Sequence, residues 1–238
     1  MEEKLRVFRQ MIEESKSAVF FGGAGVSTAS GIPDFRSAKG IFTQNAERSP
    51  EEIVSADFFY RHTADFYDFY REKMLFPDAK PNAAHYKLAE LERRGKIRAV
   101  VTQNIDGLHQ AAGSENVVEL HGSALRNYCT RCGKFFDMDY ILRAKGVPVC
   151  SCGGLIKPDV VLYGESLKTR DLDLASQYTQ EADLLIVGGT SLAVNPAAGF
   201  VYNYSGKYLV LVNKSITGAD SYADLVFHED IAEVFKNL

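Results

Sequence analysis

The sequence predicts an α/β fold, a Rossmann-like doubly wound parallel sheet with a smaller helical module and a zinc-ribbon insert. Three observations predict it. Short apolar runs with the length of buried strands alternate with helical segments, which is the pattern of a parallel sheet covered on both faces. The first of these runs leads directly into a glycine-rich turn, residues 22–28. Two close pairs of cysteines interrupt the alternation in the middle of the chain.

Length and charge limit the possible classes of protein. A chain of 238 residues holds one large domain, or a large domain and a small one. The net charge of −4 argues against a general affinity for nucleic acid, which needs a basic surface. The first 16 residues are too charged for a signal peptide, and no apolar run approaches the ~20 residues that cross a bilayer. We therefore expect a cytoplasmic protein with no nucleic-acid or membrane partner.

Apolar spacing gives the expected order of elements. A first helix is predicted over residues 3–15, where Leu5, Phe8, Met11 and Ile12 recur at helical spacing. The expected strands cover residues 18–21, 97–102, 117–120, 160–165, 183–187, 208–212 and 224–227. The expected later helices cover residues 80–91, with Pro81 in the first turn, and about 170–181, and begin near residues 196 and 230. The run 160–165 is expected to return the chain to the main sheet.

The division into parts follows from composition. Residues 41–76 carry many aromatic side chains among charges, without strand-like alternation, and predict a helical excursion from the sheet. We expect a Rossmann-like domain from residues 1–36, 77–124 and 158–238. The helical module then covers residues 37–76, and the zinc-ribbon module covers residues 125–157.

The glycine-rich turn has the composition of a phosphate cradle. Glycine lets the backbone approach a ligand closely, and the N–H groups at the next helix start point at an anion. Gly23 and Gly25 supply two glycines of a dinucleotide fingerprint, but Thr28 replaces the third, so the match alone is weak. Just beyond the turn, Asp34, Phe35 and Arg36 place an acid, an aromatic ring and a guanidinium side by side, which a plain structural loop does not need.

Polar groups follow the other predicted strands. Ligands of an open α/β sheet bind beyond the carboxyl ends of its strands. Asn104 and Asp106 come directly after one strand, although both could instead cap the next helix. His121 ends another strand and is followed by glycine, and an imidazole can take a proton from a sugar hydroxyl near neutral pH. We predict a catalytic role for His121 rather than a structural one. The remaining histidines have no special neighbours in the sequence: His62, His85, His109 and His228.

The four cysteines are spaced as metal ligands. Cys129 and Cys132 form a CxxC pair, Cys150 and Cys152 form a CxC pair, and seventeen residues separate the pairs. Close pairs at this separation are typical of a zinc ribbon, and four thiolates fill a tetrahedral zinc, so the metal would be structural. Two disulfides or four free thiols would also account for the spacing. A reducing cytosol favours zinc.

Together these motifs resemble one family. The order GAGVST, GIPDFR, TQNID, HG, CxxC, CxC, GGTSL and VN, across roughly residues 19–231, is similar to that of the sirtuins, the NAD-dependent protein lysine deacylases, of bacterial type. The resemblance implies that NAD lies across the sheet edge as co-substrate, that Asp106 holds its carboxamide, and that Arg36 meets its pyrophosphate. It implies a cofactor site made of Ala24, Gly25, Thr28, Asp34, Phe35, Arg36, Gln103, Asn104, Ile105, Asp106, His121, Gly189, Thr190, Ser191, Asn213 and Ile231.

The resemblance also implies a reaction and a protein substrate. An acetylated lysine would enter between residues 161–165 and 192–195, and its acyl oxygen would attack the ribose carbon as nicotinamide leaves. His121, with Asn104 ordering the ribose or a water, would then deprotonate a ribose hydroxyl, giving free lysine and acetylated ADP-ribose. The implied peptide contacts are Val161, Gly164, Glu165, Leu192 and Val194.

One departure bears on the acyl group. Sirtuins that remove succinyl or malonyl groups carry a tyrosine followed three residues later by an arginine. Here Tyr67 is followed by Tyr70, which indicates a preference for uncharged acyl groups. Lys214, after Asn213, places a cation near the expected adenosine ribose.

Three rival functions stay open at this point. An ordinary NAD-dependent dehydrogenase is disfavoured, because the acidic residue expected about twenty positions after the glycines does not end a second strand. The two remaining rivals are a non-enzymatic NAD or ADP-ribose sensor and a mono-ADP-ribosyltransferase.

Overall fold

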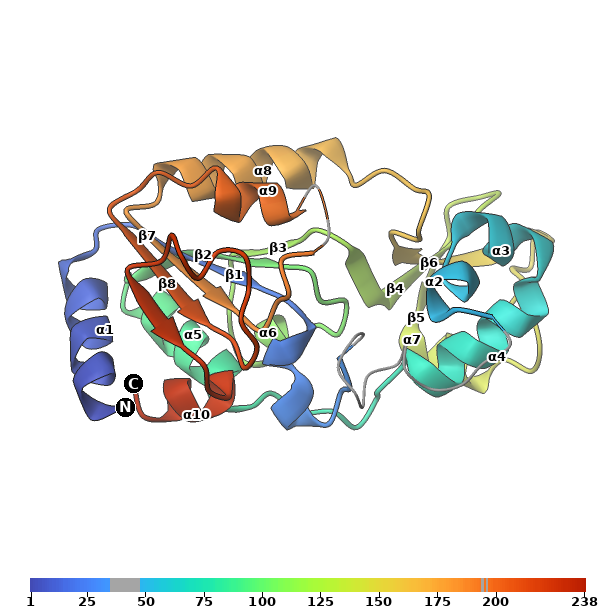
Figure 1. Ribbon diagram of the computed structural model, residues 1–238. Helices are drawn as coiled ribbons and strands as arrows, with labels where there is room; N and C mark the ends of the chain where they lie inside the picture. Colours follow the sequence, from blue (N-terminus) through green and yellow to red (C-terminus); the bar gives the residue numbers. More distant parts are fainter. Residues whose placement is uncertain (35–47, 194, 196) are drawn as a thin grey trace.

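The computed structural model describes residues 1–34, 48–193, 195 and 197–238 (Figure 1). Within them, six strands form a parallel sheet in the order β3-β2-β1-β7-β8-β9. The strands are β1 (Ala18–Gly22), β2 (Ile97–Thr102), β3 (Val117–Glu119), β7 (Leu184–Gly188), β8 (Tyr208–Val212) and β9 (Leu225–Phe227). The expected Rossmann-like sheet is therefore present, and six of the seven predicted strands belong to it.

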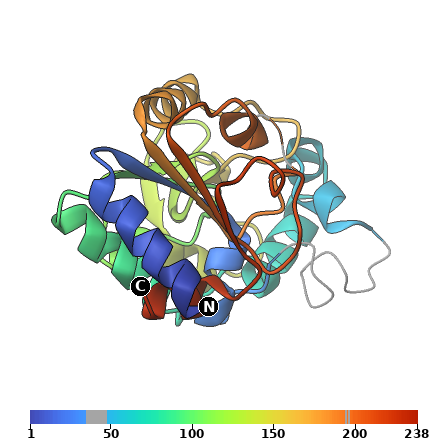
Figure 2. The ribbon, with the colours of Figure 1, turned by 60° about the vertical axis from the view of Figure 1, so that its left-hand side comes forward.

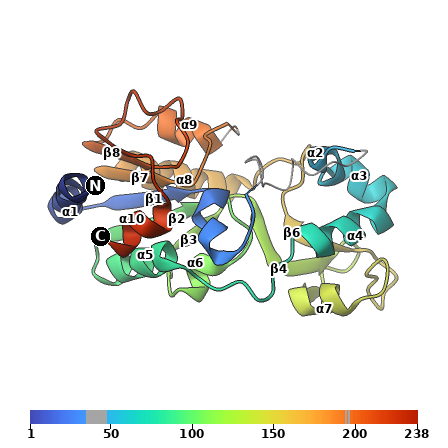
Figure 3. The ribbon, with the colours of Figure 1, turned by 60° about the horizontal axis from the view of Figure 1, so that its bottom comes forward.

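Helices cover both faces of this sheet. They are α1 (Glu2–Glu14), α5 (Ala83–Arg93), α6 (Leu108–Ala111), α8 (Thr169–Glu181), α9 (Ala197–Tyr202) and α10 (Ile231–Lys236). Figures 1 and 3 show α8 and α9 on one side of the sheet and α5, α6 and α10 on the other. No helix in the described part of the chain is both long enough and apolar enough to span a membrane.

The alternation of side chains along β1 explains the two layers. Phe20 packs into a core with α1, α5 and α10, while Phe21 faces the opposite core beneath α8 and α9. Both rings are fully buried, as expected for a parallel strand covered on both faces. The two ends of the chain lie near each other beside α1 (Figure 2). Arg9 of α1 donates a hydrogen bond to the carbonyl of Leu238 (3.1 Å).

A second lobe stands beyond the carboxyl edge of the sheet (Figure 1). It holds a three-stranded sheet of β5 (Phe135–Asp137), β4 (Gly122–Cys129) and β6 (Ile156–Val160), in that order, with antiparallel pairings. Its helices are α2 (Pro50–Ile53), α3 (Ala56–Arg61), α4 (Thr63–Lys73) and α7 (Met138–Arg143).

The helical and cysteine-containing parts of this lobe share one core. Phe59, Phe66 and Tyr70 pack in the same cluster as Cys129 and Ile156. The Tyr67 hydroxyl donates to the carbonyl of Ile156, and Arg71 donates to that of Ile141 (2.9 Å). The shared core explains how a polar cysteine-bearing insert is held in place. The residue boundaries predicted for the three parts stay a prediction.

The prediction that residues 160–165 return to the main sheet was wrong. The strand is β6, which ends at Val160 and pairs with β4 in the small sheet. Gly164, at φ +89°, sits in the turn that follows. The apolar run misled the prediction because Val160 and Leu162 are indeed buried, but in the core of the second lobe.

Two local predictions also differ from the structure. The glycine turn leads into two short 3-10 turns, Ala24–Val26 and Thr28–Ser30, rather than directly into an α-helix. Pro81 lies outside its helix, because Asn82 is the N-cap: its side chain accepts from Ala84 N (2.9 Å), and its own N–H donates to His85 Nδ1 (3.2 Å).

His85 and His109 form a buried pair, contrary to the prediction that they lack special neighbours. Their ring centroids are 4.8 Å apart. Both nitrogens of His109 and Nε2 of His85 lack hydrogen-bond partners among the described residues. Burial lowers the pKa of His85 to about 4, and burial together with the neighbouring His85 lowers that of His109 to about 3. Both rings are therefore neutral in the folded protein.

This pair predicts acid lability. Below the ordinary histidine pKa near 6.5 the unfolded chain binds protons that the folded chain excludes, so the free energy of unfolding falls from pH 6.5 toward about 4. His109→Leu should flatten that slope by about 1 kcal/mol per pH unit in urea denaturation. His62→Gln, at an exposed histidine, is the control. An unchanged slope in His109→Leu would contradict the assignment.

Candidate active site

A cavity of about 960 Å³ opens where the strands β1, β2, β7 and β8 end and the second lobe begins. Most of the predicted site residues line it: Ala24, Gly25, Thr28, Asp34, Gln103, Asn104, Ile105, Asp106, His121, Val161, Gly164, Glu165, Gly189, Thr190, Ser191, Asn213 and Ile231. Leu192 does not line it and is instead buried beside α9 in the sheet core. Phe35, Arg36 and Val194 lie outside the described residues.

The floor of the cavity is made by two interlocked glycine turns. Gly25 donates its N–H to the carbonyl of Gly189 (2.8 Å). A Cβ atom on Gly25 would lie 2.8 Å from Gly189 Cα, and one on Gly189 would lie 2.3 Å from Val26 N. Gly189 also has φ +58°. Only residues without side chains allow this contact, so the glycines are required by backbone packing as well as by any bound phosphate.

Ser27 connects the polar groups that follow β2. Its hydroxyl donates to Asp106 Oδ2 (2.6 Å) and accepts from Asn104 Nδ2 (3.1 Å). Asp106 Oδ1 accepts from the N–H of Leu108 (2.9 Å), the first residue of α6, although the N-cap of this helix is Gly107. Burial raises the pKa of Asp106, and these hydrogen bonds oppose the rise. Asp106 thus lines the cavity and also holds the first N–H of α6, while the cap position itself belongs to Gly107.

The sequence prediction missed Ser27. It is a small hydroxyl in a glycine-rich turn, and only its fully buried contact with the β2 end distinguishes it from a solvated serine. Its place next to Thr28 was the one hint available. Thr28 itself donates to the carbonyl of Gly25 (3.0 Å) and stiffens the turn.

His121 presents one nitrogen to the cavity in a fixed tautomer. Nδ1 lies 2.9 Å from the carbonyl oxygen of Gln103. A carbonyl only accepts, so Nδ1 carries the proton and Nε2 keeps a lone pair. Burial lowers the pKa of His121, while the bond to Gln103 partly opposes this. The imidazole is therefore neutral at pH 7 and able to accept a proton at Nε2.

Gln103 and Thr190 join the ends of β2 and β7. Gln103 Nε2 donates to Thr190 Oγ1 (3.1 Å), which also accepts from the N–H of Leu192 (3.2 Å). Leu192 has φ +52°, in the left-handed region that non-glycine residues rarely occupy. The hydroxyl of Thr190 thus holds a strained bend at the edge of the site.

Residues 161–165 form a turn tied to both lobes. Val161 donates its N–H to the carbonyl of His121 (3.0 Å), and Tyr163 donates to that of Val54 (3.0 Å). Glu165 Oε2 accepts from the N–H of Leu162 (2.9 Å) and from Lys157 Nζ (3.0 Å). One oxygen of Glu165 is therefore engaged in shaping the turn, although the residue was expected to contact a peptide.

The wall on the side of the second lobe is largely apolar. Ile105, Tyr70, Met74, Val160 and Leu162 line the cavity there, and all of them belong to or pack against the same hydrophobic cluster. The Tyr70 side chain is 1% exposed, and burial raises its pKa, so the phenol is neutral. This wall fits an uncharged group.

The other end of the cavity lies at β8 and β9. Asn213, Lys214, Glu229 and Ile231 line it. Lys214 Nζ is 2.7 Å from Asp230 Oδ2. The cation that the sequence places after Asn213 therefore has an acidic partner.

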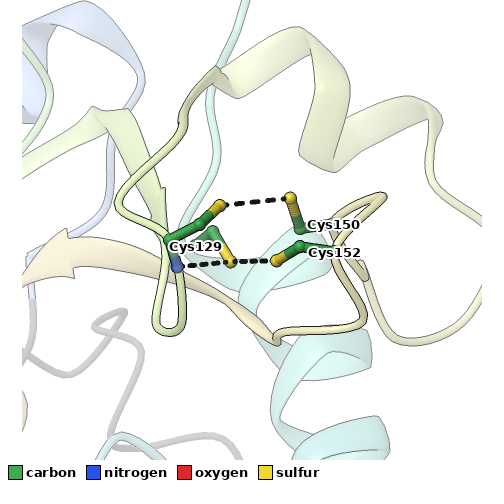
Figure 4. A group of neighbouring side chains, drawn as sticks. Cys129, Cys150 and Cys152 are labelled. Carbon is green, nitrogen blue, oxygen red and sulfur yellow. Dashed lines mark hydrogen bonds between the residues drawn. The ribbon is translucent and has the colours of Figure 1, made fainter.

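The four cysteines lie outside the cavity and form one cluster (Figure 4). Their Sγ atoms are all within 4.8 Å of one another, with separations of 3.4 Å between Cys129 and Cys152 and 3.7 Å between Cys132 and Cys150. A disulfide requires about 2.0 Å, whereas a tetrahedron of about 2.3 Å zinc–sulfur bonds has edges of about 3.8 Å. The cluster thus fits a structural zinc, and Arg131 and Cys132 direct N–H groups at Cys129 Sγ.

Zinc removal tests the cluster. Cys132 is exposed, so Cys132→Ser should change packing little but lose the metal and lower the melting temperature by roughly 10 °C or more. Zinc content and thermal denaturation measure this, with the exposed Lys145→Ala as control. A wild-type protein that keeps its melting temperature after chelation would contradict a structural zinc.

The chain is similar to proteins of known family. A model of the Sir2 family matches residues 23–196. The NAD-dependent protein deacetylase of Clostridium perfringens is 55% identical over 238 residues, which cover 98% of each chain. A Sir2 structure with a histidine-to-alanine substitution, holding deacetylated p53 peptide and 3′-O-acetyl ADP ribose, matches with a TM-score of 0.90 and 41% identity, over 98% of this chain and 96% of that one. Sir2Tm bound to a propionylated peptide matches with a TM-score of 0.87 and 42% identity, over 98% and 96%.

Proposed function

This chain belongs to the Sir2 family, and we infer that it is an NAD-dependent protein lysine deacetylase in which His121 is the general base. The reaction transfers the acetyl group from lysine to ADP-ribose and releases nicotinamide. The observation that carries the role of His121 is its tautomer: Nδ1–H is held by the Gln103 carbonyl, and Nε2 is left with a lone pair. The proton that it takes comes from a hydroxyl of the NAD ribose.

We assign the nicotinamide end to the group around Ser27. Asp106 and Asn104 are joined through the Ser27 hydroxyl, and Ile105 lies between them at the apolar wall. A half-buried carboxylate and a buried amide offer one acceptor and one donor to a carboxamide. Ala24, Gly25, Thr28, Gly189, Thr190 and Ser191 then surround the phosphates and riboses, with Gln103 between the two turns.

The apolar wall receives the acyl-lysine. Breaking the bond to nicotinamide leaves a cation-like sugar carbon, so the site must exclude water and hold the acetyl oxygen in line. Met74, Ile105, Val160 and Leu162 supply such a surface. The turn 161–165 offers a peptide backbone beside the cavity, and its link to the His121 carbonyl sets the distance between the peptide and the base.

We also propose a cytoplasmic location. The four cysteines are unpaired and grouped as metal ligands, which is the usual state of thiols in a reducing compartment.

His121→Ala tests the function. We expect turnover of an acetyl-lysine peptide to fall by at least ~100-fold, because no other described side chain can replace His121 Nε2 as the proton acceptor. Free nicotinamide and deacetylated peptide are measured together, with zinc content and NAD binding as checks on the fold. His62→Gln should keep wild-type turnover. Full activity in His121→Ala would contradict the role of His121, and an unchanged cofactor beside acetylated peptide would contradict the function and favour a sensor.

Acyl preference tests the apolar wall. A succinyl group would bring a carboxylate against neutral side chains. Among the described residues, the lysine that lines this part is Lys73, and its Nζ is 2.9 Å from Glu72 Oε1. Acetyl and propionyl peptides should exceed a succinyl peptide in kcat/KM by at least ~100-fold. Tyr70→Phe keeps the wall and should keep the preference. Comparable turnover of acetyl and succinyl peptides would contradict it.

A further inference from the structure

The end of the cavity at β8 and β9 carries an acidic side chain that the reaction does not use. His121 marks the end where chemistry occurs, and an extended dinucleotide that places its nicotinamide there reaches β8 with its adenosine half. Glu229, on the segment between β9 and α10, lines the cavity at that end together with Asn213 and Ile231.

The neighbouring charges are already paired. Asp230 Oδ2 is 2.7 Å from Lys214 Nζ, and Asp230 Oδ1 accepts from the N–H of Ala232 (2.8 Å). Lys214 is therefore neutralised by Asp230 and is not a dedicated partner for a phosphate. The second carboxylate, that of Glu229, adds negative charge at the same place.

Glu229 has an oxygen without a donor. Its Oε2 atom is buried and receives no hydrogen bond from the residues that the structure describes. A buried acceptor without a partner is unfavourable, and more so when it carries charge. Because Glu229 also lines the cavity, a turn of its carboxylate toward a donor on a bound group would remove that cost.

We propose that the Glu229 carboxylate accepts a hydrogen bond from the adenosine half of NAD and selects against a 2′-phosphate in that position. This rests on the proposed function, which makes NAD the co-substrate. Adenosine offers donors in its 6-amino group and its ribose hydroxyls. A 2′-phosphate replaces a donor by a dianion, which the unpaired carboxylate repels. Glu229 is thus a residue that determines cofactor specificity, at a distance from the chemistry.

Binding to the zinc-loaded full chain tests the proposal without turnover. Calorimetry compares ADP-ribose with 2′-phospho-ADP-ribose. The wild type should bind ADP-ribose at least tenfold more tightly than 2′-phospho-ADP-ribose. Glu229→Gln keeps an acceptor but loses the charge, and it should reduce this ratio of affinities about tenfold. Glu233→Gln removes a charge from the exposed side of α10 and should leave the ratio unchanged. A ratio unaltered by Glu229→Gln would overturn the proposal.

A second variant identifies the donor. Glu229→Ala also removes the acceptor and should weaken ADP-ribose binding about fivefold. The same measurement is made with the analogue that carries hypoxanthine in place of adenine. If Glu229→Ala does not weaken the binding of this analogue, the donor is the 6-amino group. If it weakens the binding of the analogue as much as that of ADP-ribose, the donor is a ribose hydroxyl. Unchanged ADP-ribose binding in Glu229→Ala would overturn the hydrogen bond. A wild type that binds no ADP-ribose would contradict the proposed function itself. A wild type that binds ADP-ribose with an affinity that substitutions of Glu229 leave unchanged would contradict only this inference.

Discussion

The register of three parallel strands determines where the site can form. Gly22 at the end of β1 lies opposite Thr102 of β2 and opposite Gly188 of β7. The hydrogen bonding continues one residue farther, from Gln103 N to the carbonyl of Gly22 (3.0 Å) and from Gly23 N to that of Gly188 (3.1 Å). All three turns therefore leave the sheet at one level. This register brings together the turn that holds Gly25 and Ser27, the segment after β2 with Asn104 and Asp106, the Gly189 turn and His121, which are far apart in sequence.

Much of this could be predicted from the sequence, since it depends on local rules. Apolar runs of strand length predicted all six strands of the main sheet, because parallel strands buried on both faces contain few polar residues. Polar residues directly after such runs were then expected in one crevice, and Asn104, His121 and Thr190 do line one cavity. The cysteine spacing predicted the cluster because the metal geometry needs little support from the rest of the fold.

The missed features depend on contacts between distant segments. Val160 and Leu162 are buried in the second core, and sequence alone does not say which of two cores a buried run joins. Ser27 acquires its role only by meeting Asp106, 79 residues later. The pairing of His85 with His109 joins α5 to α6 beside Phe20 of β1, and neither neighbourhood in the sequence is unusual.

His121 lies on the segment that joins the large sheet to the small one, between β3 and β4. The large sheet holds its ring through the Gln103 carbonyl, while the second lobe holds its backbone through the Val161 N–H. A rigid-body movement of one lobe against the other must therefore shift the imidazole relative to the sugar. The position of Nε2 thus depends on both lobes at once, and a bound molecule that touches both of them would fix it.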